Sequence, residues 1–123
     1  MNITILCVGQ IKEKYFRDAI AEYQKRLSRY CKLQMIEVAD EKTKENASEA
    51  ENDLIRKKEG ERLLKHIKDS DYCITLEIDG KMLTSEGLSK EIDRLGLAGK
   101  SSLVFVIGGS LGLSGAVLNR ADY

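Results

Sequence analysis

Long apolar runs are missing from this sequence of 123 residues. No stretch approaches the roughly 18 consecutive apolar residues that a membrane-spanning helix needs. Met1 is followed by the polar Asn2 and by the short apolar run Ile3–Val8, without the basic segment that opens a signal peptide. The sequence therefore predicts a cytoplasmic protein with no membrane partner.

An excess of charge of either sign is also missing. Twenty Lys and Arg residues balance 20 Asp and Glu residues, so the formal net charge is zero. A neutral chain is a poor stand-alone binder of nucleic acid, because phosphate neutralisation supplies most of that affinity. A polyanionic partner would require a local basic patch or a second subunit. The mixture of 42% hydrophobic and 33% charged residues is typical of one soluble globular domain, residues 1–123.

Cysteine and histidine are scarce and show no motif spacing. Cys7, Cys31 and Cys73 lie far apart among apolar neighbours, without a C-x-x-C pair. We therefore expect buried, reduced thiols rather than a metal or redox site. His66 is the only histidine, which leaves almost no material for a Ser-His-Asp or Cys-His arrangement. Its place among lysines at the end of a predicted helix favours a surface role.

Apolar runs alternate with helical patterns along the chain. The predicted strands are Ile3–Val8, Leu33–Val38, Tyr72–Ile78 and Ser102–Ile107, and the predicted helices are Lys12–Tyr30, Ser48–Ile67, Ser85–Leu95 and Ser114–Arg120. This alternation predicts an α/β fold: an open, mostly parallel sheet with helices on both faces. The fourth run is wholly apolar after its first residue, so we expect a central strand, and we expect Ala39–Asn46 to be a mobile loop.

Several details of the helices are also predicted. The apolar residues of the first helix form one stripe, and its opposite face carries charges of both signs, which favours a solvated face over an RNA-binding one. In the second helix the apolar residues gather towards the ends, so we expect its middle turn to be solvated. For the third helix we expect Ser85 as the N-cap and Gly96 as the glycine after the C-cap.

The most informative segment follows the fourth predicted strand. Ligands of open parallel sheets bind outside the carboxyl ends of the strands, here after Val8, Leu76 and Ile107. Gly108-Gly109-Ser110-Leu111-Gly112 has three glycines in five residues, so its backbone can approach a ligand closely and offer N–H groups to it. The spacing matches neither the dinucleotide-binding nor the P-loop motif. A tight strand-to-helix turn without a ligand is an equally good interpretation.

A second candidate lies at the end of the third predicted strand. Glu77 and Asp79 are two residues apart and would share one face of a strand, which allows a pair of carboxylates. A solvated strand end followed by a turn aspartate is the better interpretation.

The whole sequence resembles one family of small bacterial enzymes, the large-subunit ribosomal RNA pseudouridine N3-methyltransferases, of the SPOUT class of knotted α/β methyltransferases. The matching segments occur in order and span the chain. They are Met1–Tyr15, Glu22–Leu27, Ile36–Lys42, Lys58–Gly60, Leu76–Met82 with Ser85–Gly87, and Phe105–Ser110 with Gly112-Leu113.

This resemblance implies a homodimer that uses S-adenosyl-L-methionine and methylates N3 of a modified uridine in the large-subunit rRNA of the assembled ribosome. Leu76 and Gly108 match family positions that contact the cofactor, and together with Gly109 and Ser110 they are the predicted cofactor-binding residues. No DNA partner is implied. The resemblance assigns no catalytic residue within this sequence, where Glu77 is a weak candidate for a base.

Members of the family continue for a few dozen residues beyond the position of Tyr123, and that tail threads through a loop to form the knot. Its Thr-Phe-Pro-His-Gln motif has no counterpart here. The lack of any proline partly follows, because one family proline lies in the tail and another stands where this chain has Ala39. We therefore expect a SPOUT-like domain without the knot-forming segment, with an uncovered strand edge and apolar surface that favour association. The alternative is a catalytically inactive, knot-less module that binds nucleosides or proteins weakly.

Overall fold

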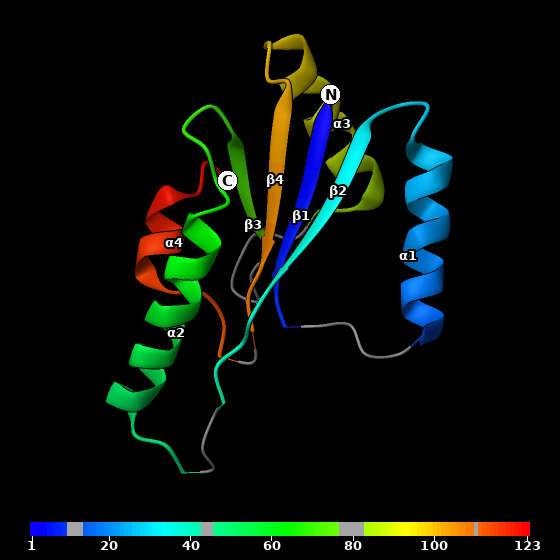
Figure 1. The fold of residues 1–123 in the computed structure, drawn as a ribbon. Helices are drawn as coiled ribbons and strands as arrows, with labels where there is room; N and C mark the ends of the chain where they lie inside the picture. Colours follow the sequence, from blue (N-terminus) through cyan, green and yellow to red (C-terminus); the bar gives the residue numbers. More distant parts are fainter. Residues whose placement is uncertain (10–13, 43–45, 77–82, 110) are drawn as a thin grey trace.

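The computed structural model describes residues 1–9, 14–42, 46–76, 83–109 and 111–123. Along these residues strands and helices alternate: β1 (Asn2–Val8), α1 (Lys14–Leu27), β2 (Lys32–Val38), α2 (Glu49–Leu64), β3 (Tyr72–Leu76), α3 (Ser85–Leu97), β4 (Ser102–Ile107) and α4 (Gly115–Arg120). The strands form one parallel sheet in the order β2-β1-β4-β3 (Figure 1). The predicted α/β class and the central place of β4 are confirmed. No described helix is long and apolar enough to cross a bilayer.

The strand register brings the carboxyl ends of four strands to one edge of the sheet. Val8 pairs with Val38 at the end of β1, and Leu76 pairs with Ile107 at the ends of β3 and β4. Because all these strands run in the same direction, the segments that follow them leave the sheet together. This edge is where an open parallel sheet places its ligands.

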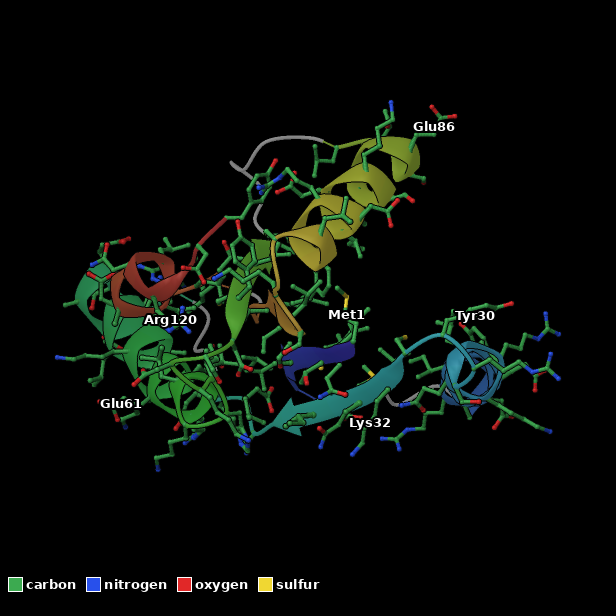
Figure 2. All side chains as sticks on the ribbon, turned by 90° about the horizontal axis from the view of Figure 1, so that it is seen from above. Met1, Tyr30, Lys32, Glu61, Glu86 and Arg120 are labelled. Carbon is green, nitrogen blue, oxygen red and sulfur yellow. The ribbon has the colours of Figure 1, made fainter. Side chains whose placement is uncertain are left out.

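Helices cover both faces of the sheet, as predicted. Helices α2 and α4 lie side by side over one face, and α3 lies over the other (Figures 1 and 2). The first face buries Leu6, Val38, Cys73, Val104 and Val106 against Leu63 of α2 and Val117 of α4. The second buries Ile74, Leu103 and Phe105 against Leu95 of α3. Alternate residues of β3 and β4 point to opposite faces, so these two strands anchor both cores.

Helix α1 stands beside β2, away from both cores (Figures 1 and 2). Its predicted apolar stripe is only partly covered, because Tyr15 and Leu27 are exposed, and so is Tyr30, just beyond the helix. The sequence does contain an apolar stripe, but the other described residues do not cover all of it. On the charged face, Arg26 forms an exposed ion pair with Glu22 at 3.0 Å.

The ends of α3 differ from the prediction. Thr84, not Ser85, is the N-cap, and its hydroxyl accepts a hydrogen bond from the Gly87 N–H at 2.9 Å. Gly96 lies inside the helix, and Gly99 is the residue with a positive φ of 83°. Lys100 N donates to Leu95 O and Gly99 N donates to Gly96 O, which are the two bonds of a Schellman motif. The helix therefore runs further than its sequence pattern, and the later glycine ends it. Ser48 and Ser114, where two of the predicted helices begin, are the N-caps of α2 and α4.

The middle of α2 is buried, which contradicts the expectation of a solvated turn. Glu59 is 4% exposed, and Gly60 is also buried. A Cβ added to Gly60 would lie 2.4 Å from Ser114 Oγ and 3.2 Å from Val117 Cγ2. The prediction failed because it counted only apolar side chains, whereas α2 and α4 meet here through a glycine.

The cysteine thiols are free, and Cys7 and Cys73 are buried, whereas Cys31 is partly exposed. Burial raises the pKa of the Cys73 thiol, and the carboxylates of Asp122 and Asp71 add to this effect. Burial likewise raises the pKa of Cys7.

The contact between α2 and α4 predicts opposite effects for two glycine substitutions. Gly60→Ala should lower the free energy of unfolding, because ~1–3 kcal/mol of overpacking against Ser114 and Val117 outweighs the usual gain from alanine in a helix. Gly115→Ala is the matched control, since a Cβ there meets nothing within 4 Å. It should leave stability unchanged or raise it. Urea denaturation measures both, and equal stability of the two variants would contradict the close contact.

Candidate ligand-binding site

A cleft of about 560 Å³ lies beside β3, on the side of α3. Its walls come from the second half of β3, the first turns of α3 with the residues before them, and the end of the described chain. The lining residues are Ile74, Thr75, Leu76, Leu83, Thr84, Ser85, Leu88, Glu91, Asp122 and Tyr123. A cavity of this size holds a ligand of nucleoside dimensions.

Apolar side chains are exposed where β3 and β4 end. Leu76 is 50% exposed and lines the cleft, and its register partner Ile107 is 39% exposed. Leu83 and Tyr123, also in the lining, are exposed as well. Apolar residues gathered in a hollow rather than scattered are typical of a binding site.

Asp122 and Tyr123 form the outer wall of the cleft, and main-chain hydrogen bonds fix this wall to the open edge of β3. Tyr123 N donates to Cys73 O at 3.2 Å, and Thr75 N donates to Tyr123 O at 3.2 Å. One residue that bonds in this way to two residues of a neighbouring strand shows parallel pairing. Asp122 strengthens the junction, because its Oδ2 accepts from Cys73 N at 2.9 Å.

Two carboxylates line the cleft, and each is paired with an arginine. Arg94 donates to both oxygens of Glu91, at 2.5 and 3.2 Å, and this hydrogen bonding lowers the pKa of the Glu91 carboxyl. Asp122 is the second carboxylate in the lining, and its Oδ2 also accepts from Arg120 Nη1 at 3.2 Å. Arg94 therefore balances the charge of the Glu91 carboxylate, and Arg120 that of Asp122.

A tight glycine turn follows β4 at the same edge of the sheet. Gly112 N donates to Gly109 O at 3.0 Å, and Gly112 has a φ of 82°, which favours glycine. A Cβ on Gly108 would lie 2.9 Å from the carbonyl carbon of Gly112, so no side chain fits inside the turn. The glycines are needed for the turn itself, and they leave its backbone open to a close neighbour.

Comparison with known proteins identifies the family. The model of a family described as predicted SPOUT methyltransferase matches residues 1–123. The chain belongs to this SPOUT methyltransferase family. Proteins named ribosomal RNA large subunit methyltransferase H are similar to it over all 123 residues, which cover 77% of each relative: 57% identical in Clostridium kluyveri, 58% in Clostridium novyi and 59% in Bifidobacterium adolescentis.

The structure of this SPOUT chain brings part of the predicted cofactor site together. Leu76 lines the cleft, and Gly108 and Gly109 follow its register partner on β4, although neither is part of the cleft lining. Ser110 lies outside the described residues, as do Glu77 and Asp79. The assignment of Leu76, Gly108, Gly109 and Ser110 to a cofactor stays a prediction.

His66 lies at the opposite end of the molecule. It is exposed just after α2 and lines a polar hollow near the amino ends of the strands, together with Lys32, Lys65 and Lys68. Among the described residues no three His, Cys, Asp or Glu side chains gather as a metal site.

Sequence reasoning missed most of the cleft. Ser85 was treated only as a capping candidate, and Thr84, Asp122 and Tyr123 belong to no predicted motif. Their common signal is proximity to the carboxyl end of β3, which becomes visible only when the register is known. Glu59 was also missed, although a glycine beside it inside a helix marks a close contact.

The junction between Asp122 and β3 can be tested with two substitutions. Asp122→Ala leaves the N–H of the buried Cys73 without this acceptor, so unfolding should become easier by ~1–3 kcal/mol. Asp122→Asn keeps a carbonyl oxygen at the same place and should retain most of the stability. Urea denaturation gives the free energies, and amide exchange at Cys73 reports the bond. Identical behaviour of both variants and the wild type would show that the junction does not hold the cleft wall.

Proposed function

We propose that this chain is an S-adenosyl-L-methionine-dependent methyltransferase of large-subunit ribosomal RNA, acting on N3 of a pseudouridine in the assembled ribosome. The observation that carries the proposal is the similarity, at 57–59% identity over every residue of the chain, to proteins named as large-subunit rRNA methyltransferases. The matched length includes the segments that form the cleft and the glycine turn.

The cleft fits the proposed cofactor in size and chemistry. S-adenosyl-L-methionine combines an aromatic purine and a ribose with a sulfonium, an ammonium and a carboxylate group. The apolar surfaces of Leu76 and Leu83 suit the faces of the purine, and the polar side chains of Thr84 and Ser85 suit the polar groups. The adjoining glycine turn can offer main-chain groups to the polar edges of a nucleoside.

The residues of the chain act by binding and orientation. When bound, the cofactor supplies the methyl group. The cleft beside β3 holds the donor in one place, so that transfer to a docked nucleotide becomes a proximity effect rather than a random encounter. N3 must also lose its proton. None of the described residues is assigned as the base, and Glu77 stays a candidate outside the described ranges.

The proposed partners are large-subunit rRNA in the ribosome and a second copy of this chain. Because the chain has no net charge, RNA binding calls for a local basic patch, which two copies of the chain would extend across their interface. The exposed apolar residues of α1, Tyr15 and Leu27, give a surface that association could cover.

Calorimetric titration with S-adenosyl-L-methionine tests the proposal. The wild type should bind with a dissociation constant on the order of micromolar. Gly108→Ala should weaken binding by about tenfold or more, because a Cβ there displaces the backbone of Gly112. Gly115→Ala, away from the turn interior, should bind like the wild type.

The matching activity assay follows radiolabelled methyl transfer to ribosomes that lack the modification. Incorporation at the proposed uridine supports the assignment. The absence of both binding heat and transfer would instead favour the catalytically inactive α/β module.

A further inference from the structure

One charged side chain is buried where the sequence predicted a solvated helix turn. Glu59 of α2 is 4% exposed. Its Oε2 accepts a hydrogen bond from Glu41 N at 3.0 Å, which ties α2 to the segment after β2. Its Oε1 is also buried and has no hydrogen-bond partner among the described residues.

The unpaired oxygen faces the glycine turn. A Cβ added to Gly109 would lie 3.1 Å from Glu59 Oε1, 3.5 Å from Oε2 and 3.2 Å from Val8 Cγ1. The turn therefore packs directly on the carboxylate, with no space for a side chain between them. This contact is made from the α2 side of the sheet, whereas the cleft lies on the α3 side.

Two further contacts from α2 reach the same stretch of chain. Arg56 Nη1 donates to Leu111 O at 3.3 Å, one turn before Glu59. Gly60 meets Ser114, the N-cap of α4. Helix α2 thus contacts the segment from Gly109 to Ser114 at three successive places, and Glu59 is the contact nearest to β4.

An acceptor on a buried carboxylate is costly when it stays unpaired, and a backbone N–H is its usual partner. The turn that packs on Oε1 is built from glycines, whose N–H groups are not shielded by side chains. A donor from this turn would pair the oxygen and fix the turn to α2 in one step.

We propose that Glu59 is a positioning residue of the cofactor site: Oε1 supports the glycine turn where Gly109 packs on the carboxylate, while Oε2 holds the segment at Glu41. The proposal rests on the cofactor binding proposed above and extends it. Glu59 acts through the turn and does not touch the cofactor itself. One carboxylate thereby links the chain after β2 to the chain after β4.

Glu59→Gln tests this role with almost no change in volume. The amide has a single carbonyl oxygen, so when that oxygen accepts from Glu41 N, an NH2 group faces the glycine turn in place of Oε1. We expect amide exchange at Gly112 to be about tenfold faster and binding of S-adenosyl-L-methionine to be about tenfold weaker than in the wild type. Glu61→Gln is the matched control, because Glu61 is exposed on the outer side of α2 (Figure 2). It should change neither quantity.

A double-mutant cycle keeps the test independent of whether Glu59→Gln folds well. Gly109→Ala pushes a methyl group against the carboxylate and should loosen the turn by itself. If the two residues act through one contact, the exchange rate at Gly112 in the double variant should rise by less than the product of the two fold-increases seen in the single variants. Strict additivity would overturn the proposal.

The outcomes separate the two proposals. A wild type that gives no binding heat contradicts the proposed function, whereas the exchange measurement still decides the role of Glu59, since it needs no cofactor. A Glu59→Gln variant that melts at a lower temperature but keeps wild-type exchange at Gly112 and wild-type affinity shows a structural role only. That result would overturn the positioning role.

Discussion

The contact between the middle of α2 and the chain after β4 is the constraint on which the rest of the structure depends. Gly60 lets α2 approach Ser114, the residue that caps α4, and Glu59 lies under Gly109 of the glycine turn. If α2 stood further away, α4 would lose the neighbour against which Val117 is buried. The turn would then lose its support on the face opposite to the cleft.

This arrangement explains why the cleft forms where it does. The register of β3 with β4 sets Leu76 beside Ile107, and the glycine turn must leave the sheet directly after Ile107. With α2 holding that turn from one side, the surface on the α3 side stays open. There the cap at Thr84 starts α3 and Asp122 pins the outer wall, so rigid elements surround a hollow with apolar walls.

The sequence predicts the parts of this fold that depend on local patterns. Apolar β-branched runs mark the strands, and Ser48 and Ser114 mark helix starts, because a hydroxyl before a helix satisfies its free N–H groups. The failures depend on contacts between distant segments. Gly96 and Gly99 are equivalent as local signals, and only the Schellman bonds distinguish them. Burial of Glu59 was likewise invisible, since charged residues in a helix are usually solvated. Leu76 was placed in the site by the family resemblance, whereas Tyr123 needed the register.

The most direct test of this account is an NMR titration of the isotope-labelled wild type with S-adenosyl-L-methionine, in which backbone amide shifts locate the bound cofactor. The account predicts that the largest shifts fall at Thr75 and Leu76, at Leu83 to Ser85, and at Gly108 to Gly112. Shifts confined to the polar hollow around Lys32 and His66, at the other end of the strands, would contradict it.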